Sequence, residues 1–126
     1  MTALFSLHGG RTQHHALELA LYPEAGARWG YRVVLRGGRD KLIEVYRMRR
    51  GSDTLLITVP LGSPVTGGGR HELIWSQTAG GLLRIALDGS ELTQLQDKAF
   101  KDAYHYLRFT NLGGDIALRD FLIKGR

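Results

Sequence analysis

The sequence contains no cysteine, which excludes disulfides, thiolate metal sites and cysteine nucleophiles. None of its apolar runs approaches the length that a helix needs to cross a bilayer, so we predict no membrane span. The first ten residues have neither the basic segment nor the apolar run of a signal peptide. We therefore expect a cytoplasmic protein if this N-terminus is native, and an exported one if a leader has been removed.

The composition is that of an ordinary globular chain. It has 126 residues, of which 43% are hydrophobic and 23% charged, enough to bury a core without covalent support. We predict that residues 1–126 form a single domain. The net charge of +5 is spread along the chain, and Arg47, Arg49 and Arg50 are its only tight basic cluster. Without a concentrated basic stripe to follow phosphates, we predict no specific nucleic-acid partner.

Nearly every segment alternates between apolar and polar residues with a period of two, which is typical of half-buried strands. Gly-rich turns separate these segments, and no βαβ spacing or fixed internal repeat is present. The segments with this pattern are 15–22, 29–36, 41–48, 54–60, 70–78 and 82–87. The sequence therefore predicts an all-β protein, an antiparallel two-sheet β-sandwich.

Three local features refine this prediction. Asp88 and Gly89 stand between alternating runs, the pattern of a type I′ hairpin turn with positive φ at both residues. In the last strand the alternation slips near Arg119 and Asp120, and a β-bulge there would return the apolar residues to the core. The polar segment 97–104 is too short for a packed helix, so we expect a loop or a single turn.

The C-terminal half resembles the jelly rolls of the concanavalin A-like lectin/glucanase superfamily, which includes the laminin-G-like domains. The resemblance is carried by four segments: His71-Glu-Leu-Ile-Trp75, Gly81-Leu-Leu-Arg-Ile-Ala-Leu-Asp88-Gly89, Tyr106-Leu-Arg-Phe-Thr-Asn111 and Ile116-Ala-Leu-Arg-Asp-Phe-Leu-Ile-Lys124. It implies a jelly-roll sandwich and, by association, glycan recognition.

The glucanases of that superfamily carry a strand of the form Glu-x-Asp-x-x-Glu, and this chain has no such strand. The glutamates Glu18, Glu44, Glu72 and Glu91 are isolated from one another in sequence. Glycoside hydrolysis needs two carboxyl groups held about 5–9.5 Å apart. With no nucleophile motif either, we predict that the protein is not an enzyme.

Metal sites have two sets of candidate ligands. His8, His14 and His15 could approach one another across a turn, but the last two point to opposite faces of an extended strand. Laminin-G-like folds often use calcium, for which the oxygen donors here would be three turn or strand-end residues, Asp88, Asn111 and Asp115. Calcium takes six to eight oxygens, and these residues are explained more simply by turns. We predict no cofactor and no metal site, and calcium stays open as the alternative.

A sugar site needs an aromatic platform flanked by planar polar groups. Tyr106 and Arg108 share an outward face with Thr110, opposite two apolar residues of the same strand, whereas both tryptophans align with core positions. Tyr46 and Arg47 form a second aromatic and arginine pair. The predicted ligand-binding residues are Tyr46, Arg47, Tyr106 and Arg108.

Two functions remain open from the sequence. The first is a non-catalytic, lectin-like carbohydrate-binding module with a glycan partner. The alternative is a structural or protein-protein interaction domain, in which the sandwich offers an edge or an aromatic face to a protein partner or to another copy of itself. An enzyme of glycan metabolism is a third hypothesis, and the missing acidic strand counts against it.

Overall fold

The computed structural model describes residues 2–8, 16–23, 26, 28–37, 40–62, 70–78, 80–97, 106–113 and 115–122; for 2–8 and 115–122 only the backbone is considered. These residues form ten strands, which we label in chain order. They are β1 (Thr2–His8), β2 (Ala16–Tyr22), β3 (Gly30–Arg36), β4 (Leu42–Arg49), β5 (Ser52–Pro60), β6 (Arg70–Gln77), β7 (Leu82–Leu87), β8 (Ser90–Gln96), β9 (Tyr106–Gly113) and β10 (Asp115–Leu122).

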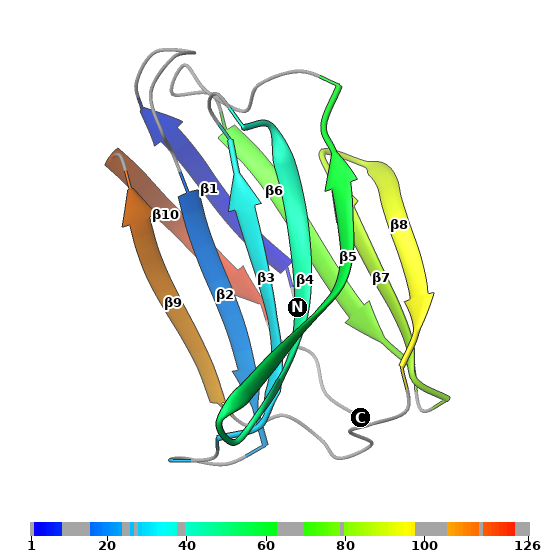
Figure 1. Ribbon diagram of the computed structural model, residues 1–126. Coiled ribbons are helices and arrows are strands. Elements are labelled where there is room, and N and C mark those ends of the chain that lie inside the picture. The colour runs from blue at the N-terminus through cyan, green and yellow to red at the C-terminus, as the bar shows by residue number, and fades with distance from the viewer. Residues whose placement is uncertain are drawn as a thin grey trace.

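The strands form two five-stranded antiparallel sheets that pack face to face (Figure 1). Sheet 1 has the order β10-β1-β6-β7-β8, and sheet 2 has the order β5-β4-β3-β2-β9. Consecutive strands mostly pair as hairpins, while β9 and β10 return to lie beside β2 and β1. The predicted all-β, antiparallel two-sheet sandwich is confirmed. The expected loop at 97–104 lies outside the described residues from position 98 onward.

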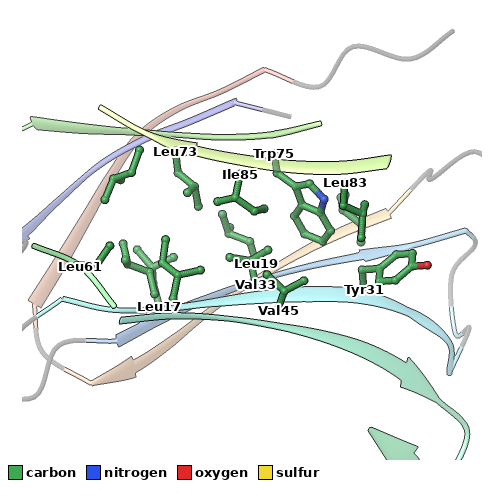
Figure 2. Packing of buried hydrophobic residues seen from close by; sticks show 14 residues of the cluster. Leu17, Leu19, Tyr31, Val33, Val45, Leu61, Leu73, Trp75, Leu83 and Ile85 are labelled. Carbon is green, nitrogen blue, oxygen red and sulfur yellow. The ribbon is translucent and has the colours of Figure 1, made fainter. Parts of the chain in front are cut away.

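The core lies between the sheets and is built from one face of each alternating strand. Sheet 2 contributes every second residue of β2 and β3, and sheet 1 contributes those of β6 and β7 (Figure 2). Trp75 and Tyr31 are the largest fully buried side chains, which confirms Trp75 as a core residue. Trp29 stands just before β3 and is only partly buried.

Two glycine positions explain how neighbouring strands meet. Asp88 and Gly89 have φ angles of 52° and 83°, so the predicted type I′ turn joins β7 and β8. At the start of β3, a Cβ on Gly30 would collide with the carbonyl oxygen of Leu21 in β2. Only glycine allows β2 and β3 to approach this closely at that end of the hairpin.

All four edge strands carry a β-bulge within the described pairings. The register skips one residue on each edge strand: Arg119 of β10, Leu112 of β9, Leu56 of β5 and Leu92 of β8. The bulge at Arg119 confirms the slip that the sequence predicted. On β5 and β8 the inserted leucine packs against the core, because the extra residue lets two neighbouring side chains point inward.

No described part of the chain is a helix long and apolar enough to cross a membrane. The outer face of sheet 2 is of more interest, since half of the residues that alternate with the core of β2, β3 and β4 are charged or tyrosine there. These side chains form the candidate site.

Candidate functional site

The outer face of sheet 2 brings charged and tyrosine side chains from all five strands together. We call this surface the arginine–tyrosine face. Its row across the middle of the sheet follows the strand register, in which Tyr46 pairs with Arg32, Arg32 with Ala20, and Ala20 with Arg108. The small, fully buried Ala20 leaves room for both flanking arginines. The face comprises Glu18, Tyr22, Arg32, Arg36, Glu44, Tyr46, Asp53, Tyr106 and Arg108.

Arg32 lies at the centre of this face. Its guanidinium carbon is 4.3 Å from the centroid of the Tyr46 ring, a cation–π contact. Its Nη1 atom is 3.1 Å from Oδ2 of Asp53 on β5 and 3.9 Å from Oε2 of Glu18 on β2. One arginine therefore links four strands and holds the Tyr46 ring from one side.

Glu44 joins a second arginine to the same tyrosine. Arg36 Nε donates to Glu44 Oε1 at 2.8 Å, and the Tyr46 hydroxyl donates to Oε2 at 2.7 Å. Burial alone would raise the pKa of Glu44, but the hydrogen bonds from Tyr46 and Arg36 outweigh it and hold that pKa below its ordinary value. Burial and the hydrogen bond to Glu44 raise the pKa of Tyr46. At neutral pH the pair is a carboxylate with a protonated tyrosine.

The β9 end of the face is its most open part. Arg108 Nη2 is 3.3 Å from Oε1 of Glu18, and its guanidinium carbon lies 5.3 Å from the centroid of the Tyr22 ring. The side chain of Arg108 is 57% exposed and residue Tyr106 is 50% exposed, whereas the Glu18 side chain is 9% exposed. Tyr106 pairs in register with Tyr22. Glu18 therefore acts as a covered anchor beneath an exposed arginine and tyrosine.

The charges of the face balance. Three arginines (Arg32, Arg36 and Arg108) meet three carboxylates (Glu18, Glu44 and Asp53), and each arginine lies within 4.0 Å of at least one carboxylate. The protein's net charge of +5 therefore does not come from this surface. The face offers fixed donors and acceptors rather than a strong potential of one sign.

The structure brings three of the four predicted ligand residues onto this face. Tyr46, Tyr106 and Arg108 all point away from the core, as the alternation indicated for β9. Arg47 instead pairs with Tyr31 on the inner side of β4, and its Nη1 atom is 2.9 Å from Oδ2 of Asp97, which follows β8 in the other sheet. The roles of all four predicted residues in ligand binding stay predictions.

Sequence reasoning did not select six residues of the face: Glu18, Tyr22, Arg32, Arg36, Glu44 and Asp53. The signal was present, because the alternation of β2 and β3 already placed Glu18, Arg32 and Arg36 opposite the core. Carrying the same alternation through β4 would have added Glu44 beside Tyr46. Asp53 was not accessible in this way, since the bulge on β5 changes the register of that strand.

The two candidate metal ligands whose side chains are described, Asp88 and Asn111, lie in different sheets. Asp88 lies in the turn between β7 and β8 of sheet 1. Its carboxylate accepts a hydrogen bond from the Glu72 amide and lies 2.8 Å from Nδ1 of His71. Asn111 belongs to sheet 2, and its side chain accepts from the amide of Gly113. Among residues whose side chains are described, no three His, Asp or Glu groups could hold a metal ion. The side chains of Asp115 and His8, and residues 14 and 15, lie outside the described part.

Two groups of the face, Glu44 and Tyr46, are poorly suited to acid–base catalysis. Glu44 is tied to Arg36 and Tyr46 and its pKa is lowered, so it is a weak base. The raised pKa of Tyr46 equally makes its phenolate hard to form. What remains is a set of planar guanidinium and carboxylate groups and tyrosine rings whose positions are fixed by one another.

Two solved structures share this fold. The carbohydrate-binding module CBM66 from Bacillus subtilis superposes with a TM-score of 0.72 at 14% sequence identity, covering 94% of this chain and 70% of that one. Sheep galectin-11, solved in complex with glycerol, gives a TM-score of 0.70 at 14% identity, covering 94% and 84%. The predicted concanavalin A-like lectin/glucanase fold is thereby confirmed. No protein-family model matches the sequence, and no curated protein matches it.

Proposed function

We propose that this protein is a non-catalytic carbohydrate-binding module whose ligand lies on the arginine–tyrosine face. The observation that carries the proposal is the charge-balanced network of three arginines, three carboxylates and stacked tyrosines on the outer face of one sheet. The likeness of the fold to a carbohydrate-binding module and a galectin supports it.

The ligand class follows from the chemistry of the exposed groups. A sugar ring has an apolar face that packs on an aromatic ring, which the half-exposed Tyr106 supplies. Its hydroxyls need donors and acceptors fixed in a plane: the guanidinium of Arg108 provides donors beside Tyr106, and the carboxylate of Asp53 provides acceptors at the opposite edge of the face. Because the charges of the face cancel, a neutral oligosaccharide fits better than an acidic one. Four strand spacings of about 4.8 Å make the face about 19 Å wide, room for more than one ring.

The test is a glycan-array screen followed by titration calorimetry on the best neutral sugar. We expect Arg108→Ala to weaken binding about tenfold or more, because a charge-assisted hydrogen bond contributes about 1.5–3 kcal/mol. Arg84→Ala is the matched control: Arg84 is 54% exposed on sheet 1 and its loss changes the net charge equally. Binding by the unaltered protein should persist in high salt and after chelation of calcium.

Three outcomes would contradict the proposal. Equal losses in the two alanine variants would reduce the interaction to net charge. Binding only to polyanions that fades with salt would do the same. Failure to bind any glycan on the array would leave the protein-interaction alternative as the better account of this face.

A further inference from the structure

Three exposed arginines gather at one end of the sandwich, away from the arginine–tyrosine face. At this end β2, β4 and β8 finish and β3 and β9 begin (Figure 1). The β4–β5 hairpin turns there through Arg50 and Gly51, directly after Arg49. Arg28 and Trp29 come immediately before β3. We call Arg28, Arg49 and Arg50 the basic tip.

The strand register brings the arginines of the tip together. Gly30 of β3 pairs with Met48 of β4. Arg28 and Arg50 each stand two residues beyond this pair on adjacent chain segments, and neighbouring strands are about 4.8 Å apart. All three arginines of the tip are exposed. The tip therefore presents three cations to solvent at the neighbouring ends of β3 and β4.

The described carboxylates closest to the tip are engaged by other arginines. Asp97 is 2.9 Å from Arg47 and its side chain is 5% exposed. Asp53 is 3.1 Å from Arg32. Within the described part of the chain, no ion pair involves Arg28 or Arg50. Their charges are therefore not balanced by described residues, in contrast to the charges of the arginine–tyrosine face.

The shape of the tip suits a flat anionic surface. Arg50 lies in the two-residue turn of a hairpin, so it stands beyond the ends of the paired strands. Guanidinium groups bind phosphate oxygens through paired hydrogen bonds. Trp29 beside Arg28 is partly buried, and tryptophan is enriched where bilayer headgroups meet water. Polyanionic chains such as single-stranded nucleic acids are instead held along charged grooves, which a hairpin turn does not form.

We propose that the basic tip docks the protein end-on to a bilayer surface rich in anionic phospholipid, with headgroup phosphates on Arg28 and Arg50. The contact is peripheral, and its strength comes from charge near the surface. Because the tip lies at the ends of strands, the strands stand upright on the bilayer. The arginine–tyrosine face then points sideways and stays open to its ligand. The docking itself does not depend on what that face binds.

The test is co-sedimentation of the full chain with vesicles made of equal amounts of phosphatidylserine and phosphatidylcholine. We expect binding that weakens as salt is added, and no binding to pure phosphatidylcholine. Replacing both arginines, Arg28→Gln with Arg50→Gln, should weaken partitioning about thirtyfold, which is the usual contribution of two basic side chains near such a surface. Both positions are exposed, so the variant should keep its unfolding midpoint.

Lys41→Gln with Arg70→Gln is the matched control, because both are exposed cations at the opposite end and their loss changes the net charge equally. The eight residues of β4 alone span about 27 Å, well beyond the screening length of about 10 Å. The control variant should therefore lose less than about threefold in partitioning.

Equal losses in the two double variants would overturn the proposal, because net charge alone would then explain the binding. Absence of binding to the anionic vesicles would overturn it as well. Binding to heparin without binding to these vesicles would assign the tip to an acidic polysaccharide instead. Glycan binding by a protein that ignores vesicles would leave the proposed function intact while refuting the docking, and vesicle binding without glycan binding would do the reverse.

Discussion

Glu18 is unusual because its carboxylate is almost fully covered although the side chain points away from the core. It is 7% exposed, and its two oxygens lie near guanidinium groups of Arg32 and Arg108. A covered charge is tolerated only when it is paired, because burial removes its hydration. Glu18 therefore holds two arginines of the face at defined positions, and its own position depends on them.

Removing this charge while keeping the shape should reveal that role. We expect Glu18→Gln to lower the free energy of unfolding by about 1–3 kcal/mol, because Arg108 loses its carboxylate partner and Arg32 keeps only Asp53. Glu91→Gln serves as control, since Glu91 is half exposed beside Arg84 on sheet 1 and should change stability by less than about 0.5 kcal/mol. Urea denaturation measures both. Equal effects would show that Glu18 is no more than a surface ion pair.

At the scale of an element, β9 shows how one strand serves two surfaces. Tyr106 and Arg108 are exposed on the outer face, while Leu107 and Phe109 are partly buried and pack against the core cluster. The strand is also an edge, so its pairing with β2 is its sole described contact within the sheet. Stability and ligand contact should therefore separate cleanly along this strand.

Alanine substitutions along β9 test that separation. Leu107→Ala and Phe109→Ala should each cost about 2–3 kcal/mol, the low end for core truncation because both side chains are only partly buried. Tyr106→Ala should stay within about 0.5 kcal/mol of the unaltered protein while weakening glycan binding. Thermal and urea unfolding give the stabilities. Equal destabilisation by all three changes would mean that the outward assignment of Tyr106 is wrong.

The elements also show what the sequence can and cannot predict. Alternation was sufficient for β2 to β7, for the turn at Asp88 and for the slip at Arg119, because period-two burial is local and each of these strands has one buried face. Strand β1 was not among the segments that it selected. The face itself depends on register between strands distant in sequence, such as Glu18 beside Arg108. Arg47 shows the limit most clearly: its neighbour Tyr46 faces out, and only the partner Asp97 in the other sheet explains why an arginine lies on the inner side.

At the scale of the whole molecule, Arg47 and Asp97 connect the two sheets. The Asp97 side chain is 5% exposed and that of Arg47 27%, so this ion pair is partly screened from water at the rim of the core. Asp97 is further fixed by its amide, which donates to the carbonyl of Gly81. The pair therefore fastens the chain after β8 to β4 of the opposite sheet.

We expect Asp97→Asn to lower the free energy of unfolding by about 2 kcal/mol, because it leaves Arg47 without its carboxylate in a poorly hydrated place. Asp53→Asn is a suitable comparison, since Asp53 also contacts an arginine but is 41% exposed. Its cost should be below about 1 kcal/mol. Denaturant unfolding followed by tryptophan fluorescence measures both, with the buried Trp75 as a probe. Similar losses of stability in the two variants would show that the ion pair between the sheets stabilises the fold no more than an exposed ion pair does.

The four bulges have a consequence for how this fold can vary in length. Each extra residue lies on a strand with one neighbour in its sheet, so it shifts a single ladder of hydrogen bonds. The same insertion in β2, β3 or β7 would have to be accommodated on both sides at once and would turn core residues outward. Single-residue gains and losses can therefore accumulate at the rims of the two sheets, while the six inner strands keep a constant length and carry the architecture unchanged.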